Sequence, residues 1–121
     1  MKRDMNLIRD ILLEIEKLPA GESDSGLEIP GRDQREVVYH AHLLIDAGFV
    51  DGIFVAGPGG GPFCAHRLTW AGHEFLDAAR SETIWKNTMQ RINETTGAVA
   101  IPVLVELLSA TTRKALGLDS S

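Results

Sequence analysis

Apolar side chains recur every three or four residues between positions 4 and 18, which is the spacing of one face of an α-helix. Asp4 stands just before the first of them and can accept hydrogen bonds from the free N–H groups of a first helical turn. Pro19 and Gly21 follow the last apolar position and favour its end. We therefore predict a helix from Asp4 to Leu18 with an apolar face made by Met5, Ile8, Ile11, Leu12, Ile15 and Leu18.

A short alternating pattern follows a polar loop. Leu27, Glu28 and Ile29 read apolar, polar, apolar, which is typical of a strand. Pro30 and Gly31 would end that strand, because both residues favour turns.

A second helical pattern begins at Arg32 or Asp33 and runs to about Ala47. Asp33 and Glu36 resemble a capping box in which Asp replaces the usual Ser or Thr. At about 100° per residue, one side of this helix is apolar and the other is polar. The apolar side holds Val37, Ala41, Leu44, Ile45 and Gly48, and the side toward solvent or a ligand holds Arg35, Tyr39, His42 and Asp46.

A hairpin is predicted directly after this helix. Residues 49–55 form an apolar strand interrupted at Asp51 and Gly52, and residues 63–68 form its partner. The connecting segment, Gly57 to Pro62, is so rich in glycine and proline that it predicts a loop.

Three further helices are expected. Residues 69–79 predict one with Trp70, Phe75 and Leu76 as apolar anchors. Ser81 can cap another that runs to about Glu94. Residues 98–101 are expected to be extended, because a residue before proline disfavours helix. Pro102 suits the first turn of a last helix, which Gly117 would end.

The order helix, strand, helix, strand, loop, strand, helix predicts an α+β fold of the winged helix-turn-helix type. We expect one domain, residues 1–121, with a winged-helix-like core at 1–80 and a helical extension at 81–121. Between Ile29 and Leu44 there is room for one full helix, whereas a helix-turn-helix needs two. Either the first helix has shrunk to a turn near Pro30–Asp33, or the fold lacks a true helix-turn-helix.

Composition narrows the functional classes. The chain has 121 residues, no apolar run near the roughly 20 residues that span a bilayer, and no pattern of a signal peptide, so no membrane role is expected. A single cysteine, Cys64, excludes an intramolecular disulfide and fits the cytoplasm. The net charge of −5 works against nucleic-acid binding, and residues 28–70 hold five acids against three arginines.

The winged-helix pattern nevertheless indicates which residues would contact DNA if the protein binds it. Arginine can pair with guanine, and polar or aromatic side chains can reach phosphates and base edges. The candidate DNA-binding residues are Arg32, Gln34, Arg35, Tyr39, His42 and Arg67. The alternative interpretation is a solvated face of mixed polarity, with Asp46 on the same side repelling phosphate.

Neither catalysis nor a cofactor is expected. The glycine-rich loop lacks the Lys-Ser/Thr of a phosphate-binding loop. Cys64 and His66 share a strand face, but their side chains would lie about 6–7 Å apart, too far for a nucleophile and its base. Cys64 with His66 on one strand face, and His73 with Asp77 four apart on a helix, could each supply two metal ligands. No cysteine pair and no His-Glu-x-x-His pattern is present, so structural roles are favoured over metal binding.

Several blocks of the chain resemble one family. They are Met1-Lys2-Arg3-Asp4-Met5, then Leu43-Leu44-Ile45-Asp46-Ala47-Gly48, and above all Leu68-Thr69-Trp70-Ala71-Gly72-His73-Glu74-Phe75-Leu76-Asp77. The chain resembles the phage-associated domain of unknown function 2513 over nearly its whole length. The resemblance implies occurrence in phage and prophage genomes, and it implies no activity, because the family is uncharacterised.

Two functional hypotheses remain. The first is a non-catalytic, DNA-binding transcription regulator of phage type, acting as a homodimer through its C-terminal helices, whose apolar surface exceeds the need of a terminal helix. The second is a protein-interaction module that binds a phage or host protein without DNA. Steep weakening by salt would separate the two, because only phosphate contacts release counterions.

Overall fold

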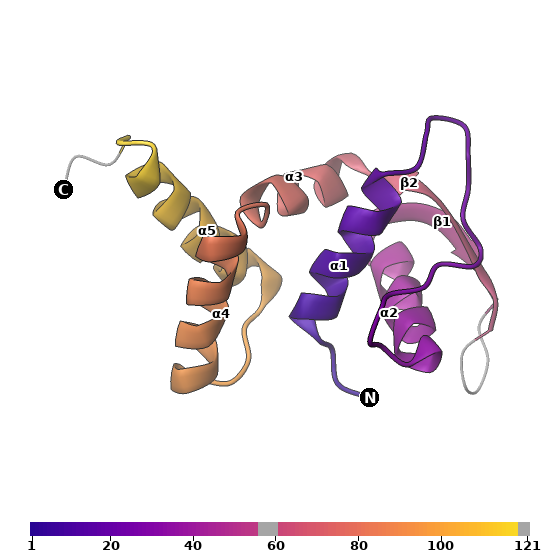
Figure 1. The fold of residues 1–121 in the computed structure, drawn as a ribbon, viewed down its shortest axis with the longest axis horizontal. Coiled ribbons are helices and arrows are strands. Elements are labelled where there is room, and N and C mark those ends of the chain that lie inside the picture. The colour runs from indigo at the N-terminus through magenta and orange to yellow at the C-terminus, as the bar shows by residue number, and fades with distance from the viewer. Residues whose placement is uncertain (56–60, 119–121) are drawn as a thin grey trace. The chain divides into compact units, whose positions relative to one another are not determined.

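The computed structural model describes residues 1–55 and 61–118, so most of the predicted loop at Gly57–Pro62 lies outside the described residues. The described elements are α1 (Met5–Glu16), α2 (Gln34–Asp46), β1 (Val50–Phe54), β2 (Phe63–Leu68), α3 (Trp70–Ala78), α4 (Glu82–Thr95) and α5 (Ile101–Ala115) (Figure 1). The chain forms two compact units, residues 1–74 and 75–121, which are described separately. The α+β class is therefore confirmed.

The first helix is the apolar centre of the N-terminal unit. Asp4 caps it as predicted, because its side chain accepts hydrogen bonds from the N–H groups of Asn6 and Leu7. The helix packs against α2 and β2. Its buried apolar residues are Met5, Leu7, Ile8, Ile11, Leu12 and Ile15, as the three-and-four spacing predicts.

A cluster of polar side chains joins the start of α1 to α2. The backbone N–H of Asp4 donates to Nε2 of His40 at 2.8 Å, so this nitrogen carries a lone pair. Nδ1 must then carry the proton of the neutral ring, and it donates to the carbonyl of Glu36 at 2.8 Å. Nη1 of Arg32 lies 2.7 Å from the Asp4 carboxylate and 3.6 Å from that of Glu36. We call these four residues the Asp4 cluster.

Helix α2 starts where the sequence predicts. Asp33 is its N-cap, with its carboxylate accepting from the N–H of Arg35 at 2.8 Å. Val37, Ala41 and Leu44 are buried on the predicted apolar side. The carboxylate of Glu36, which a capping box would turn back toward Asp33, lies beside Arg32.

The strand predicted at residues 27–29 is wrong. The pairing occurs earlier, where Asp24 and Ala65 exchange two backbone hydrogen bonds of 2.9 Å. The Asp24 side chain then accepts from the N–H of Gly26, a local turn that takes the chain off the sheet before Leu27. Leu27 and Ile29 are buried all the same. Their alternation therefore reports burial of two side chains rather than strand pairing.

The predicted hairpin is confirmed. Strands β1 and β2 pair antiparallel, from Val50 opposite Leu68 to Phe54 opposite Phe63. The register shifts between Asp51 and Gly52, where the sequence predicts an interruption, and this irregularity leaves an extra residue on β2. With the bridge at Asp24 on the other side of β2, the order across the sheet is Asp24, β2, β1.

The end of the hairpin is fastened to the turn after α2. Gly48 takes a φ of +81° and ends α2. The Thr69 hydroxyl donates to the Gly48 carbonyl at 2.6 Å and accepts from the N–H of Gly72 at 3.1 Å, so it also caps α3. A Cβ at Gly72 would lie 2.1 Å from the carbonyl oxygen of Phe49. Only glycine therefore lets α3 approach this turn so closely.

Trp70 is not the apolar anchor that we predict from the sequence. Its side chain is 81% exposed, whereas Phe75 and Leu76 are buried. Trp70 and Gly72 are two residues apart on a helix, which places them on nearly opposite sides. Because Gly72 faces the Phe49 turn, Trp70 points into solvent.

The C-terminal unit pairs α4 with α5. Ser81 caps α4 through its hydroxyl, as predicted, and Pro102 stands in the first turn of α5. Residues 98–100 form no strand, and the extended backbone predicted for residue 101 is wrong, because Ile101, directly before Pro102, is the first residue of α5. The extended conformation lies one residue earlier, at the N-cap Ala100. Gly117 follows the end of α5 with a φ of +73°. The buried apolar side chains of this unit are Phe75, Leu76, Ala79, Trp85, Ile92, Leu104 and Leu108.

Gly72→Ala tests the junction. We expect the free energy of unfolding to fall by about 1–3 kcal/mol, because a backbone carbonyl must move to admit the new methyl group. Gly26→Ala is the matched control, since its Cβ would meet only one atom, at 4.0 Å. Urea denaturation followed by circular dichroism measures both variants. Equal losses in the two variants would contradict the close approach.

The Asp4 cluster also predicts an acid limb of stability. Partial burial acts to raise the pKa of Asp4, but the hydrogen bonds from Arg32, Leu7 and Asn6 outweigh it and hold the pKa below its ordinary value. Asp4 therefore stabilises the fold fully above its unfolded pKa of about 4, and this contribution is lost as the pH falls through the lower folded pKa. Stability measured between about pH 5 and pH 2 should fall less steeply in Asp4→Asn, which retains a capping side chain. An identical slope in both proteins would show that Asp4 contributes nothing to it.

Candidate nucleic-acid interface

The outer face of α2 presents two of the six candidate residues. The side chain of Arg35 is 81% exposed and lies 3.5 Å from the Asp33 carboxylate. Tyr39, one turn further along, is 37% exposed, and its ring meets that of His40 edge-on at 5.5 Å. Helical spacing predicts this pair correctly, since residues four apart share a face.

His42 does not stand free beside them. Its ring is half-buried and stacks on Phe54 with a centroid separation of 4.5 Å. Its Nε2 lies 2.8 Å from the carbonyl of Gly61, so that nitrogen carries the donated proton. His42 thus fastens the hairpin to α2, and its ring is already occupied on the side that we expected to face a ligand.

Arg32 and Gln34 are also engaged within the fold. The amide of Gln34 donates to the Leu27 carbonyl at 2.9 Å and holds the loop that precedes α2. The hydrogen bond with Asp4 raises the pKa of Arg32 above its ordinary value, although partial burial acts against this. Arg32 therefore belongs to the support of α2 rather than to its outer face.

Arg67 is the candidate on the hairpin. It lies on β2 opposite Asp51 of β1, its side chain is 71% exposed, and its Nε is 3.3 Å from the Asp51 carboxylate. Like Arg35, it is an exposed cation with a carboxylate alongside. The surface of α2 and the hairpin therefore holds accessible arginines without a concentrated positive patch.

The segment before α2 contains no first helix of a helix-turn-helix. Residues 17–33 are fully described and hold two short turns, closed at 3.1 Å by Glu22 N–H with the Pro19 carbonyl and by Arg32 N–H with the Ile29 carbonyl. The second turn stands where that helix would be. The turn leaves α2 to be braced by α1 through the Asp4 cluster. In Figure 1, α1 and α2 lie side by side within this unit.

His66 on β2 has a local partner. Nδ1 of His66 lies 2.8 Å from the Ser23 hydroxyl, across the bridge between Asp24 and β2. Within residues 1–55 and 61–118, no three His, Cys, Asp or Glu side chains gather as a metal site would require. In the same part of the chain, no helix has the length and apolar character to cross a membrane.

The sequence analysis missed the Asp4 cluster. The only sign of the cluster in the sequence is a histidine, His40, on the apolar side of a helix. The hydrogen-bond partner of His40, Asp4, is 36 residues away in the sequence, and only the packing of α1 on α2 brings the two together.

Comparisons place the chain among known sequences. No solved structure matches it. An uncharacterized protein of Haemophilus influenzae is 38% identical over 91 residues, which cover 72% of this chain and 75% of that protein. A family model described as a hypothetical protein, DUF2513, matches residues 2–98. The resemblance read from the sequence is thereby confirmed, and the chain belongs to the DUF2513 family, whose function is unknown.

Proposed function

We propose that this protein is a non-catalytic DNA-binding regulator that contacts the duplex with the N-terminal half of α2 and with the hairpin. The order of α1, the Asp24 bridge, α2, β1 and β2 is compatible with a winged helix, a fold that commonly places one helix on DNA. The observation that carries the proposal is the exposure of Arg35 and Tyr39 on one face of α2.

The carboxylates beside the arginines do not prevent this role. Arg35 with Asp33 and Arg67 with Asp51 are exposed ion pairs, and such pairs are worth about 0–1 kcal/mol. Each arginine can therefore exchange its carboxylate for a phosphate at little cost. Arg32, His42 and Gln34 are less available, because their present contacts support α2 and the hairpin.

Two arginines make a weak interface by themselves. Each phosphate contact contributes about 0.9 to the slope of log K against log salt concentration, so one chain should give a slope near −2. A homodimer would bring two such surfaces to one duplex, and we propose that the C-terminal helices form it. Leu116 and Leu118, which are 68% and 62% exposed, are the apolar side chains that such an interface would cover.

A second candidate function is a protein-interaction module. Trp70, Ile53 and Val55 are 81%, 67% and 60% exposed in the N-terminal unit, and large exposed apolar side chains are typical of binding surfaces. The net charge of −5 also favours a protein partner over a polyanion.

A salt titration separates the two functions. Binding of a random-sequence DNA duplex at low and physiological salt should be detectable at low salt and should fall with added salt. Arg35→Ala with Arg67→Ala should weaken low-salt binding about tenfold and reduce the slope by about 2 for a single chain, or by about 4 for the homodimer.

The matched control is Lys17→Ala with Lys86→Ala. It also removes two exposed cations, each paired with a carboxylate, but on other elements. Equal weakening in the two double variants would mean that general charge, and not this surface, attracts DNA. Absence of binding even at low salt would reject the DNA function and leave the protein-interaction module, for which Trp70→Ala is the first variant to test in partner capture.

A further inference from the structure

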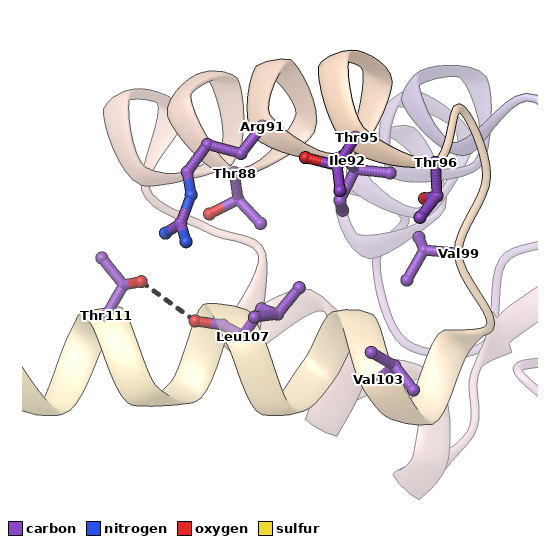
Figure 2. A pocket seen from close by; sticks show the side chains of 9 residues that line it. All are labelled: Thr88, Arg91, Ile92, Thr95, Thr96, Val99, Val103, Leu107 and Thr111. Carbon is purple, nitrogen blue, oxygen red and sulfur yellow. Dashed lines mark hydrogen bonds between the residues drawn. The ribbon is translucent and has the colours of Figure 1, made fainter.

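A groove between α4 and α5 in the C-terminal unit is independent of the proposed DNA surface. It encloses about 240 Å³, close to the lower end of small-molecule pockets. Both walls belong to the same compact unit. The lining residues are Thr88, Arg91, Ile92, Thr95, Thr96, Val99, Val103, Leu107 and Thr111 (Figure 2).

One end of the groove is apolar. Figure 2 shows Val99 and Val103 facing each other where the α4–α5 connection closes the groove, with Ile92 and Leu107 further along. The hydroxyl of Thr96 at this end is turned to the Ala98 carbonyl, to which it donates at 2.7 Å. This end therefore offers apolar surface to a hydrocarbon chain.

The other end is polar and has a hydrogen-bond donor that is not engaged within the described residues. Thr88 is only 6% exposed, yet its hydroxyl has no hydrogen-bond partner among residues 1–55 and 61–118, and Figure 2 shows it directed into the groove. Since no fully buried side-chain oxygen or nitrogen among the described residues lacks a partner, this hydroxyl is accessible from the groove and can bond to a ligand atom there. Thr111 already donates to the Leu107 carbonyl at 3.0 Å, so its oxygen can only accept from a ligand.

Positive charge gathers at this polar end. The guanidinium of Arg91 reaches across the groove toward Thr111, and it forms no ion pair within the described part of the chain (Figure 2). Lys114 lies one turn beyond Thr111 on the same side of α5 and is likewise without an ion pair among those residues. Glu94, the nearest acid along α4, accepts from the Gln90 amide at 3.0 Å. The polar end is therefore complementary to an anion.

We infer that the α4–α5 groove binds a small amphiphile with a hydrocarbon chain and a carboxylate head. Arg91 and the Thr88 hydroxyl donate to the carboxylate, because a guanidinium recognises two carboxylate oxygens at once. The chain lies along Leu107 toward Val99 and Val103. Thr111 and Val103 are eight residues apart, which corresponds to ~12 Å along the helix axis and suits a medium-length acyl chain.

Decanoate is the probe, and decanol is its uncharged counterpart. Titration calorimetry of the full chain should detect decanoate binding, and amide shifts in NMR spectra should be confined to residues 88–111. Arg91→Ala should weaken decanoate binding about tenfold and leave decanol binding unchanged, since only the carboxylate needs the guanidinium. Val103→Asp should weaken both ligands, and it alters a side chain that is 48% exposed and outside the core.

Lys86→Ala is the control, because it removes a cation from a different face of α4, where it pairs with Glu82. Equal effects of Lys86→Ala and Arg91→Ala, or shifts outside the groove, would overturn the assignment. Failure of both decanoate and decanol to bind would also overturn the assignment. If neither ligand binds and Val103→Asp converts a dimer to a monomer, the groove is part of the interface between copies and not a ligand site.

Discussion

The hydrogen bond from the Asp4 backbone to His40 is the contact on which the N-terminal unit depends. It uses the N–H of Asp4, the N-cap residue directly before α1, which no helical partner can satisfy, and it uses a ring that is fully buried on α2. The ring must stay neutral for Nε2 to accept, and its Nδ1–H keeps it in place on the Glu36 carbonyl. Arg32 adds a second contact between the starts of the two helices through its ion pair with the Asp4 carboxylate. The buried side of α2 is thereby set, and with it the side that carries Arg35 and Tyr39.

The sequence predicts the elements well where the signal is local. Apolar spacing, the caps Asp4, Asp33 and Ser81, and the stop at Gly117 depend on a few neighbouring residues. Leu27 and Ile29 misled the strand prediction because burial and strand pairing give the same short alternation. The actual bridge at Asp24 depends on Ala65, which is far away in the sequence and has no local signature.

The candidate site likewise has residues that local spacing predicts and residues that depend on tertiary packing. Arg35 and Tyr39 share a face because they are four apart on one helix, and the sequence alone predicts this. His42 has the spacing to join them, but its contact with Gly61 depends on how the hairpin lies on α2. The groove residues Thr88, Arg91 and Thr111 come together only when α4 and α5 pair, so no sequence motif predicts the groove. Trp70 is exposed for a reason that lies in Gly72, whose close approach to Phe49 turns the other side of α3 outward.

The most direct test of this account is an NMR titration of the full chain with a short random-sequence DNA duplex at low salt. If α2, held in place by the Asp4 cluster, presents the binding surface together with the hairpin, the largest backbone amide shifts should fall within residues 33–39 and 63–68. These shifts should disappear as salt is added. Residues 82–115 should remain unshifted by DNA. Shifts concentrated in residues 82–115, or no shifts at all, would contradict the account.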